Sequence, residues 1–178
     1  MVTVLPHKDL VNLPKDFTLV INTSNPKNHI YSYEILDWMH NSGICLLLNR
    51  TAYNLKSMLD NIGFNTNKLY FIDAVSKSID SKFNLDKTDY LHSYKNLNLI
   101  LSSIERLSAI PGNRFIIIDS LNHLLMHHDK KTAMSFLDFL NKRLKLLNLN
   151  SIYLADFNKL NNEVKNKLSK MSDRIINL

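Results

Sequence analysis

The sequence predicts an α/β fold of three layers, in which a mainly parallel β-sheet lies between two layers of helices. The first observation is that short apolar runs alternate with helical patterns along the chain. The second is the composition of the strongest run, Phe115–Ile118, which is continuously apolar and rich in β-branched residues. Such a run is typical of a strand that is buried on both faces, as strands of parallel sheets are.

Six runs are expected to form strands. They are Phe17–Asn22, Gly43–Asn49, Lys68–Ala74, Arg114–Asp119, Ser151–Ala155 and Arg174–Leu178. Apolar residues at helical spacing predict six helices between them. These are His29–Asn41, Ala52–Ile62, Lys95–Ile110, Leu121–Met126, Lys131–Leu147 and Lys159–Met171. Gly63 follows the second helix at the position where a glycine commonly ends one.

Two segments lack a regular pattern. Residues 1–16 contain Pro6 and Pro14, which interrupt any helix, so we expect an irregular or short-stranded lead-in. Residues 75–94 mix Ser, Lys and Asp without a period and are expected to form an irregular insertion. The length of 178 residues and the apolar fraction of 45% are ordinary for one globular domain, so we treat residues 1–178 as a single unit.

The chain has one cysteine, Cys45, inside an apolar run. No intrachain disulfide is therefore possible, which fits a reducing compartment. The first residues show no basic-then-apolar signal pattern, and no apolar run approaches the length of a membrane span. We expect a cytoplasmic protein with no membrane contact.

The positive charge is concentrated near the C-terminus. Residues 142–174 hold eight basic and three acidic residues, a net +5 out of the total +6. One interpretation is a nucleic-acid surface. Its residues would be Lys142, Arg143, Lys145, Lys165, Lys167 and Lys170. The other is a solvated helix face, because no aromatic platform is interleaved with these lysines.

Polar residues follow the expected strands, and the carboxyl ends of parallel strands meet at one edge of a sheet, where ligands bind. These residues are Thr23, Ser24, Asn49, Arg50, Asp73, Asp119, Ser120 and Asp156. Asp119 is placed where a carboxylate holds Mg²⁺ beside a nucleotide. Asp119 or Ser120 could equally cap the next helix, and for Asp73 and Asp156 we favour capping and loop-tying roles.

The succession of elements resembles a RecA-superfamily ATPase domain of the KaiC-like archaeal type, from about Phe17 to Leu178. The segment LLLNRTAYNLKSMLDNIGFNTNKLYFIDA follows the family's order of strand, helix ending in Gly, and strand. The segment YLHSYKNLNLILSSIERL resembles a helix entered through a polar stretch. FIIIDSLNHLL resembles the Walker B strand, and DRIINL resembles the closing strand. The resemblance implies a P-loop NTPase fold with Asp119 and Ser120 at the metal side of a nucleotide site.

The sequence departs from that family at two catalytic elements. A phosphate-binding loop needs glycines for close backbone approach, but the corresponding stretch NTSNPKNHIYS has none and includes Pro26. Thr23, Ser24 and Lys27 are the residues of this stretch that we expect to contact phosphate if a nucleotide binds. The family's acidic pair, which polarises the attacking water, is replaced by Asn49 and Arg50, neither of which is a general base at neutral pH.

We therefore expect a non-catalytic domain without ATP hydrolysis, with at most weak binding of ATP and Mg²⁺. It would act as a regulatory or scaffolding module in signal transduction, with a protein partner or another copy of itself. The alternatives are a DNA-associated recombinase-like paralogue and a weak NTPase with a non-standard loop. His123, His127 and His128 are close in sequence, but no cysteine accompanies them, and we expect no metal site.

Overall fold

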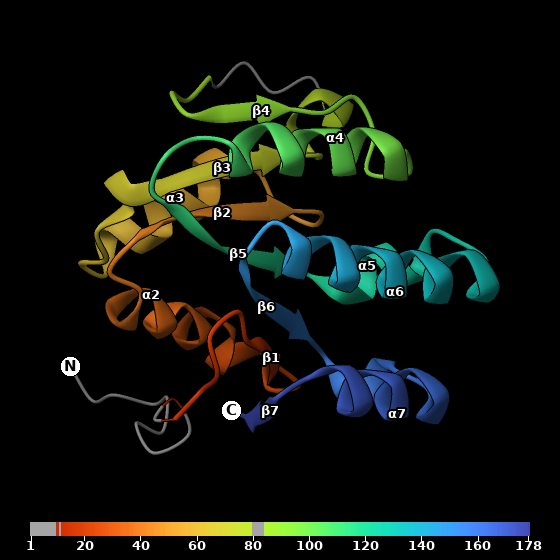
Figure 1. Cartoon of the computed structure of the whole chain (residues 1–178). Coiled ribbons are helices and arrows are strands. Elements are labelled where there is room, and N and C mark those ends of the chain that lie inside the picture. Colours follow the sequence, from red (N-terminus) through yellow and green to blue (C-terminus); the bar gives the residue numbers. More distant parts are fainter. Residues whose placement is uncertain (1–9, 11, 80–83) are drawn as a thin grey trace.

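The computed structural model describes Leu10, residues 12–79 and residues 84–178. Its centre is a sheet of parallel strands in the order β4-β3-β2-β5-β6-β1-β7 (Figure 1). The strands are β1 (Thr18–Asn22), β2 (Ser42–Leu47), β3 (Leu69–Asp73), β4 (Thr88–Tyr90), β5 (Asn113–Asp119), β6 (Asn150–Ala155) and β7 (Arg174–Asn177). The expected parallel α/β architecture is confirmed.

Side chains of successive strand residues pack into separate cores on the two faces of the sheet. In β5, Ile116 and Ile118 belong to the core under α4 (Leu97–Ser108), α5 (Leu121–Met126), α6 (Lys130–Leu146) and α7 (Asn162–Met171). Phe115 and Ile117 belong to the opposite core, under α2 (Ile35–Trp38) and α3 (Ala52–Asn61). Strand β5 is therefore buried on both faces, as its apolar run predicts, and its last residue, Asp119, is fully buried.

Side-chain caps determine where several helices begin. Thr51 accepts a hydrogen bond from the backbone N–H of Asn54 at the start of α3, and Asp129 accepts one from Thr132 at the start of α6. Asn161 caps α7 in the same way. The predicted start of α7 at Lys159 was therefore early, since Phe157–Lys159 form the 3₁₀ turn η4. Gly63 has a φ of +89°, as expected for a residue that ends a helix.

The predicted helix His29–Asn41 is helical as far as Trp38, but its first half is a 3₁₀ helix. The chain forms the 3₁₀ helix η1 (Pro26–Glu34) and then the single-turn α2. Its residues are buried without interruption from Ser32 to Leu36, whereas Tyr31 and Asp37 on either side are exposed. Five successive buried residues do not show amphipathic periodicity, so tertiary packing shapes this part of the segment.

The predicted irregular insertion 75–94 contains regular structure. Ser76–Ile79 form the 3₁₀ turn η3, and β4 extends the sheet beside β3. Backbone hydrogen bonds from Phe71 to Lys87 and from Leu91 to Asp73 hold this edge strand. Three residues are too few to show a period, so the strand depends on pairing with β3. Residues 80–83 lie outside the description, as does the lead-in prediction for residues 1–9 and 11.

Candidate functional site

Asp119, at the end of β5, is the centre of a buried polar cluster. The phenol of Tyr33 donates to its Oδ2 at 2.8 Å, and Nε2 of His29 contacts its Oδ1 at 3.1 Å. Nε of Arg50 forms an ion pair with Oδ2 at 3.2 Å. We call His29, Tyr33, Arg50 and Asp119 the Asp119 cluster. Both carboxylate oxygens of Asp119 are thus engaged by side chains of the chain itself.

The contacts of Arg50 assign the tautomer of His29. Nη2 of Arg50 lies 3.2 Å from Nδ1 of His29. A guanidinium has only donors, so Nδ1 must accept, and the proton of a neutral imidazole is then on Nε2, which donates to Asp119. Arg50 and His29 therefore contact each other, and both contact the Asp119 carboxylate.

The electrostatics favour an ionised Asp119. Burial raises the pKa of this carboxyl, but the hydrogen bonds from His29 and Tyr33 and the positive charge of the Arg50 guanidinium together keep the pKa below its usual value. Burial and the neighbouring Asp119 charge raise the pKa of Tyr33 well above its usual value. The hydroxyl of Tyr33 therefore stays protonated and remains a hydrogen-bond donor.

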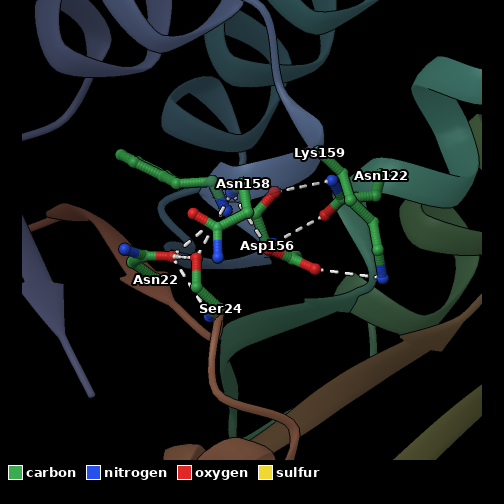
Figure 2. A network of polar contacts seen from close by, with 7 residues as sticks. Asn22, Ser24, Asn122, Asp156, Asn158 and Lys159 are labelled. Carbon is green, nitrogen blue, oxygen red and sulfur yellow. Dashed lines mark hydrogen bonds and ion pairs between the residues drawn. The ribbon is translucent and has the colours of Figure 1, made fainter.

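A second group of contacts ties the loop after β1 to the loop after β6 (Figure 2). Asn22 Oδ1 accepts from the backbone N–H of Ser24 at 3.2 Å and from the Ser24 hydroxyl at 2.6 Å. The Ser24 hydroxyl accepts from the backbone N–H of Asn158, and Asn22 Oδ1 accepts from that of Phe157. Thr23 is tied as well, because its N–H donates to the Ala155 carbonyl at 2.8 Å. The N–H groups of Thr23 and Ser24 are thus used within the protein.

Asp156 belongs to the same network. Asn122 donates through Nδ2 to the Asp156 carbonyl at 3.0 Å and accepts the Asp156 N–H at 2.7 Å (Figure 2). The Asp156 carboxylate caps η4 by accepting from Asn158 N–H and pairs with Lys159 Nζ at 3.0 Å. Burial raises the pKa of this carboxyl, but Lys159 and the bonds from Asn158 and Ser24 outweigh burial and leave it below its usual value.

Asp73 fills a comparable role at the end of β3. Its Oδ2 accepts from the N–H of Ala52 at 2.7 Å and from the Ser76 hydroxyl at 2.6 Å. Its Oδ1 accepts from the N–H groups of Val75 and Ser76. This buried carboxylate therefore joins the start of α3 to the turn after β3, which is a structural role.

A cleft of about 260 Å³ lies beside the Asp119 cluster at the ends of the strands. Its lining is Thr23, His29, Asn49, Arg50, Ser120, Asn122, His123, Met126, Asp156 and Lys159. Five residues of the predicted crevice therefore meet there. Ser24, Asp73 and the fully buried Asp119 are not in the lining. The Lys27 side chain lies outside the described part of the structure. Ser120 stands at the N-cap position of α5 but makes no side-chain capping bond there.

Sequence reasoning missed His29 and Tyr33 as site residues. Both residues lie in the predicted helix His29–Asn41, for which the sequence predicts no site role. The signal that was available is their spacing of four residues directly after the polar loop, which places two hydrogen-bonding rings together on a helical segment.

The predicted basic surface lies on α6 and α7. Two of its six residues are engaged by carboxylates, since Arg143 pairs with Glu105 at 2.6 Å and Lys167 pairs with Asp138. Within residues 12–79 and 84–178, no carboxylate pairs with the other four, Lys142, Lys145, Lys165 and Lys170. Only part of the net charge is therefore available to a partner.

The histidines after β5 are near one another, with ring centroids of His123 and His127 5.8 Å apart. The His127 ring also packs against the Tyr94 ring in a tilted arrangement, with ring centroids 4.5 Å apart. In the described part of the chain, no three His, Cys, Asp or Glu side chains gather in a way that would hold a metal ion. None of the described helices is both long and apolar enough to span a bilayer.

Comparison with known proteins places the fold. No protein-family model and no curated protein matches the sequence. A KaiC-like protein of the archaeon Pyrococcus horikoshii matches in structure with a TM-score of 0.65 at 15% identity, over 93% of this chain and 72% of that one. The flagellar accessory protein FlaH of Methanocaldococcus jannaschii matches with a TM-score of 0.55 at 16% identity, over 96% and 74%.

Another Pyrococcus horikoshii protein matches with a TM-score of 0.58 at 10% identity, over 93% of this chain and 82% of that one. At such identities the agreement concerns the fold alone. With its parallel sheet and flanking helices, this chain has the RecA-type fold of KaiC-like proteins.

Proposed function

We propose that this protein is a non-catalytic KaiC-like domain that acts in the cytoplasm as a regulatory or scaffolding module of signal transduction, without ATP hydrolysis. The observation that carries the proposal is the Asp119 cluster. The carboxylate that would bind a metal in a RecA-type ATPase is held by Tyr33, His29 and Arg50.

This donor set does not fit Mg²⁺. The ion requires near-octahedral oxygen ligands at about 2.0–2.1 Å, supplied by carboxylates, phosphates and water. Both Asp119 oxygens instead face donors, and one of these, Arg50, already supplies the positive charge that balances the carboxylate. A metal ion at Asp119 would have to displace the Arg50 guanidinium from the carboxylate. The guanidinium and the metal ion would then be two positive charges close together in a buried site, which is unfavourable.

The loop after β1 is equally unsuited to phosphate. A phosphate-binding loop directs several backbone N–H groups at the ligand. Here the N–H of Thr23 donates to Ala155 and that of Ser24 donates to Asn22, while Pro26 has no N–H. Asn49 and Arg50 provide no general base beside the cleft. Phosphoryl transfer relies on all of these parts together, so their joint replacement supports the loss of hydrolysis.

What remains is a fold in which the buried Asp119 carboxylate is neutralised within the chain. Such a domain suits a protein that works by binding other proteins. The name of one structural neighbour, a flagellar accessory protein, describes an accessory role for a protein of this fold. A regulatory or scaffolding role requires only that the surface recognise a partner.

The test is a calorimetric titration of the purified protein with Mg-ATP, followed by phosphate-release measurement on the same sample. We expect neither heat nor phosphate. Phosphate release that Asp119→Ala abolishes would overturn the proposal. Heat of Mg-ATP binding without phosphate release would support the loss of hydrolysis and make the protein a nucleotide sensor. Titration of the Arg50→Ala variant would then test whether the guanidinium limits nucleotide binding.

A DNA-associated role is the second candidate, favoured by Lys142, Lys145, Lys165 and Lys170, which no described carboxylate neutralises. It predicts DNA binding that weakens with salt and with charge reversal at Lys165, Lys167 and Lys170. Absence of binding at low salt would remove this candidate.

A further inference from the structure

Helix α6 carries two large apolar side chains on its solvent side. Phe139 is 54% exposed and Leu146 is 73% exposed. The other large apolar residues of the helix include Phe136, Leu137 and Leu140, which are buried in the core. Nothing in the described fold requires Phe139 and Leu146 to face water.

The two side chains lie on one line along the helix. They are seven residues apart, which is two turns or about 10 Å along the axis, so they face the same way. Lys142 stands between them, three residues after Phe139 and four before Leu146. We call Phe139, Lys142 and Leu146 the α6 ridge. The spacing places the aliphatic stem of Lys142 on the same side of the helix as the two apolar side chains.

The surroundings of the α6 ridge are positively charged. Lys131, Lys142 and Lys145 are exposed, and no carboxylate in the described part of the chain pairs with them. On one side of the α6 ridge, Arg143 forms an ion pair with Glu105 of α4. On the other side, Asp138 forms an ion pair with Lys167 of α7. In Figure 1, α6 runs between α4 and α7 on the same side of the sheet, so its outer face is bordered by these two helices.

The positive charge around the α6 ridge indicates which kind of partner would bind it. A second copy docked by two-fold symmetry would bring the lysines of both helices together, which is unfavourable. An amphipathic helix with leucines at the same spacing and with acidic residues on its borders would bury Phe139 and Leu146 and pair with the lysines. Leucine rows at spacings of three, four and seven residues fit between the side chains of the ridge.

We propose that the α6 ridge is the docking site for an acidic amphipathic helix of a partner protein. The proposal rests on the proposed function, because it names the class of partner that such a module would recognise. Phe139 and Leu146 supply the apolar anchors, and Lys131, Lys142 and Lys145 set the orientation through charge.

The test uses a fluorescent synthetic peptide of about 18 residues, long enough to form a helix on binding, with leucines on one face and glutamates elsewhere. A peptide of identical composition in scrambled order is the control ligand. Fluorescence anisotropy should show binding of the ordered peptide that weakens as salt is added. The double variant Phe139→Ser with Leu146→Ser, and separately Lys142→Glu, should each weaken binding at least about tenfold.

Matched control variants are available elsewhere on the chain. Ile79→Ser changes an equally exposed apolar side chain, 62% exposed on η3, and Lys95→Glu changes an exposed lysine before α4. Both should leave peptide binding unchanged. Since every altered side chain is exposed, circular dichroism should show an intact fold in all variants.

Equal binding of the scrambled peptide, or no binding of the ordered peptide at low salt, would overturn the proposal. Preferential binding of duplex DNA or of phosphatidylglycerol vesicles, sensitive to Lys142→Glu but not to the apolar double variant, would also overturn it. ATP hydrolysis, in contrast, would overturn the proposed function and leave peptide docking as it is, so the two failures are distinguishable.

Discussion

Arg50 and Asp119 form an ion pair of 3.2 Å at the ends of two neighbouring strands. Leu47, the last residue of β2, lies opposite Asp119 in β5, and the Leu48 N–H donates to the Asp119 carbonyl. The backbone register of β2 and β5 therefore brings the loop that carries Arg50 against the end of β5, where Asp119 lies. The ion pair neutralises a fully buried carboxylate from within the chain.

Replacing Arg50 by Ala should destabilise the protein by about 3 kcal/mol, because it leaves a buried carboxylate without its counter-charge. We take a value at the low end because the Arg50 side chain keeps 22% exposure. Urea unfolding measures the effect. Arg106→Ala is the matched control, since Arg106 is 62% exposed in its pair with Asp89 and should contribute less than about 1 kcal/mol. Equal losses in both variants would contradict a structural role for the Arg50–Asp119 pair.

Tyr33→Phe should cost about 1–3 kcal/mol, because it removes a buried hydrogen bond to a charged group while keeping the ring. Tyr31→Phe, two residues away and 37% exposed, should change stability little. The same unfolding measurement compares the two variants. A neutral Tyr33→Phe would mean that water or another donor replaces the hydroxyl at Asp119.

Stability should fall in acid because the folded pKa of Asp119 is below its usual value. A carboxyl with a depressed pKa stabilises the fold above its unfolded pKa, about 3.9, and this contribution disappears as pH falls through the folded value. Urea unfolding at a series of pH values below 5 should show this loss. In Asp119→Asn the pH dependence in that range should be shallower, and an unchanged slope would contradict the assignment.

A separate window is expected near neutral pH. Burial, followed by the neighbouring His127 and Lys159, lowers the pKa of His123, although Asp119 acts against them. The unfolded state then binds the proton more readily, so stability should decrease as pH falls from about 6.5 towards the folded pKa. His123→Gln should remove this part of the pH dependence in the same series and leave the acid window unchanged. If the pH dependence near neutral pH persists in that variant, a group other than His123 is responsible for it.

Gly43→Ala should destabilise the fold by about 1–3 kcal/mol through overpacking. A Cβ at this position would lie 2.2 Å from the Phe115 ring, which is itself fully buried on the neighbouring strand. Thermal unfolding measures the loss. Adding Phe115→Leu to Gly43→Ala should cost less than the sum of the two single changes, because the smaller side chain makes room. Strict additivity would show that the ring is not the obstacle.

The strands and several helix boundaries could be predicted from local sequence because their causes are local. The apolar run of β5 requires burial on both faces, and Thr51, Asn96, Asp129 and Asn161 supply caps within three residues of the N–H groups that they satisfy. The 3₁₀ helix η1 and the edge strand β4 could not be predicted in this way. The first depends on the tertiary packing that buries residues 32–36, and the second on pairing with β3.

The candidate site divides in the same manner. The sequence by itself determined that Asp119 follows a buried strand, that the loop after β1 has no glycine, and that Asn49 and Arg50, not acidic residues, follow the second apolar run. Only the tertiary structure decided what holds Asp119. Its hydrogen bonds reach residues 86 and 90 positions away in the chain, and its ion pair comes from a different strand end. No local pattern encodes such contacts, because they arise when strand register and helix packing bring distant donors to one buried carboxylate that must be satisfied.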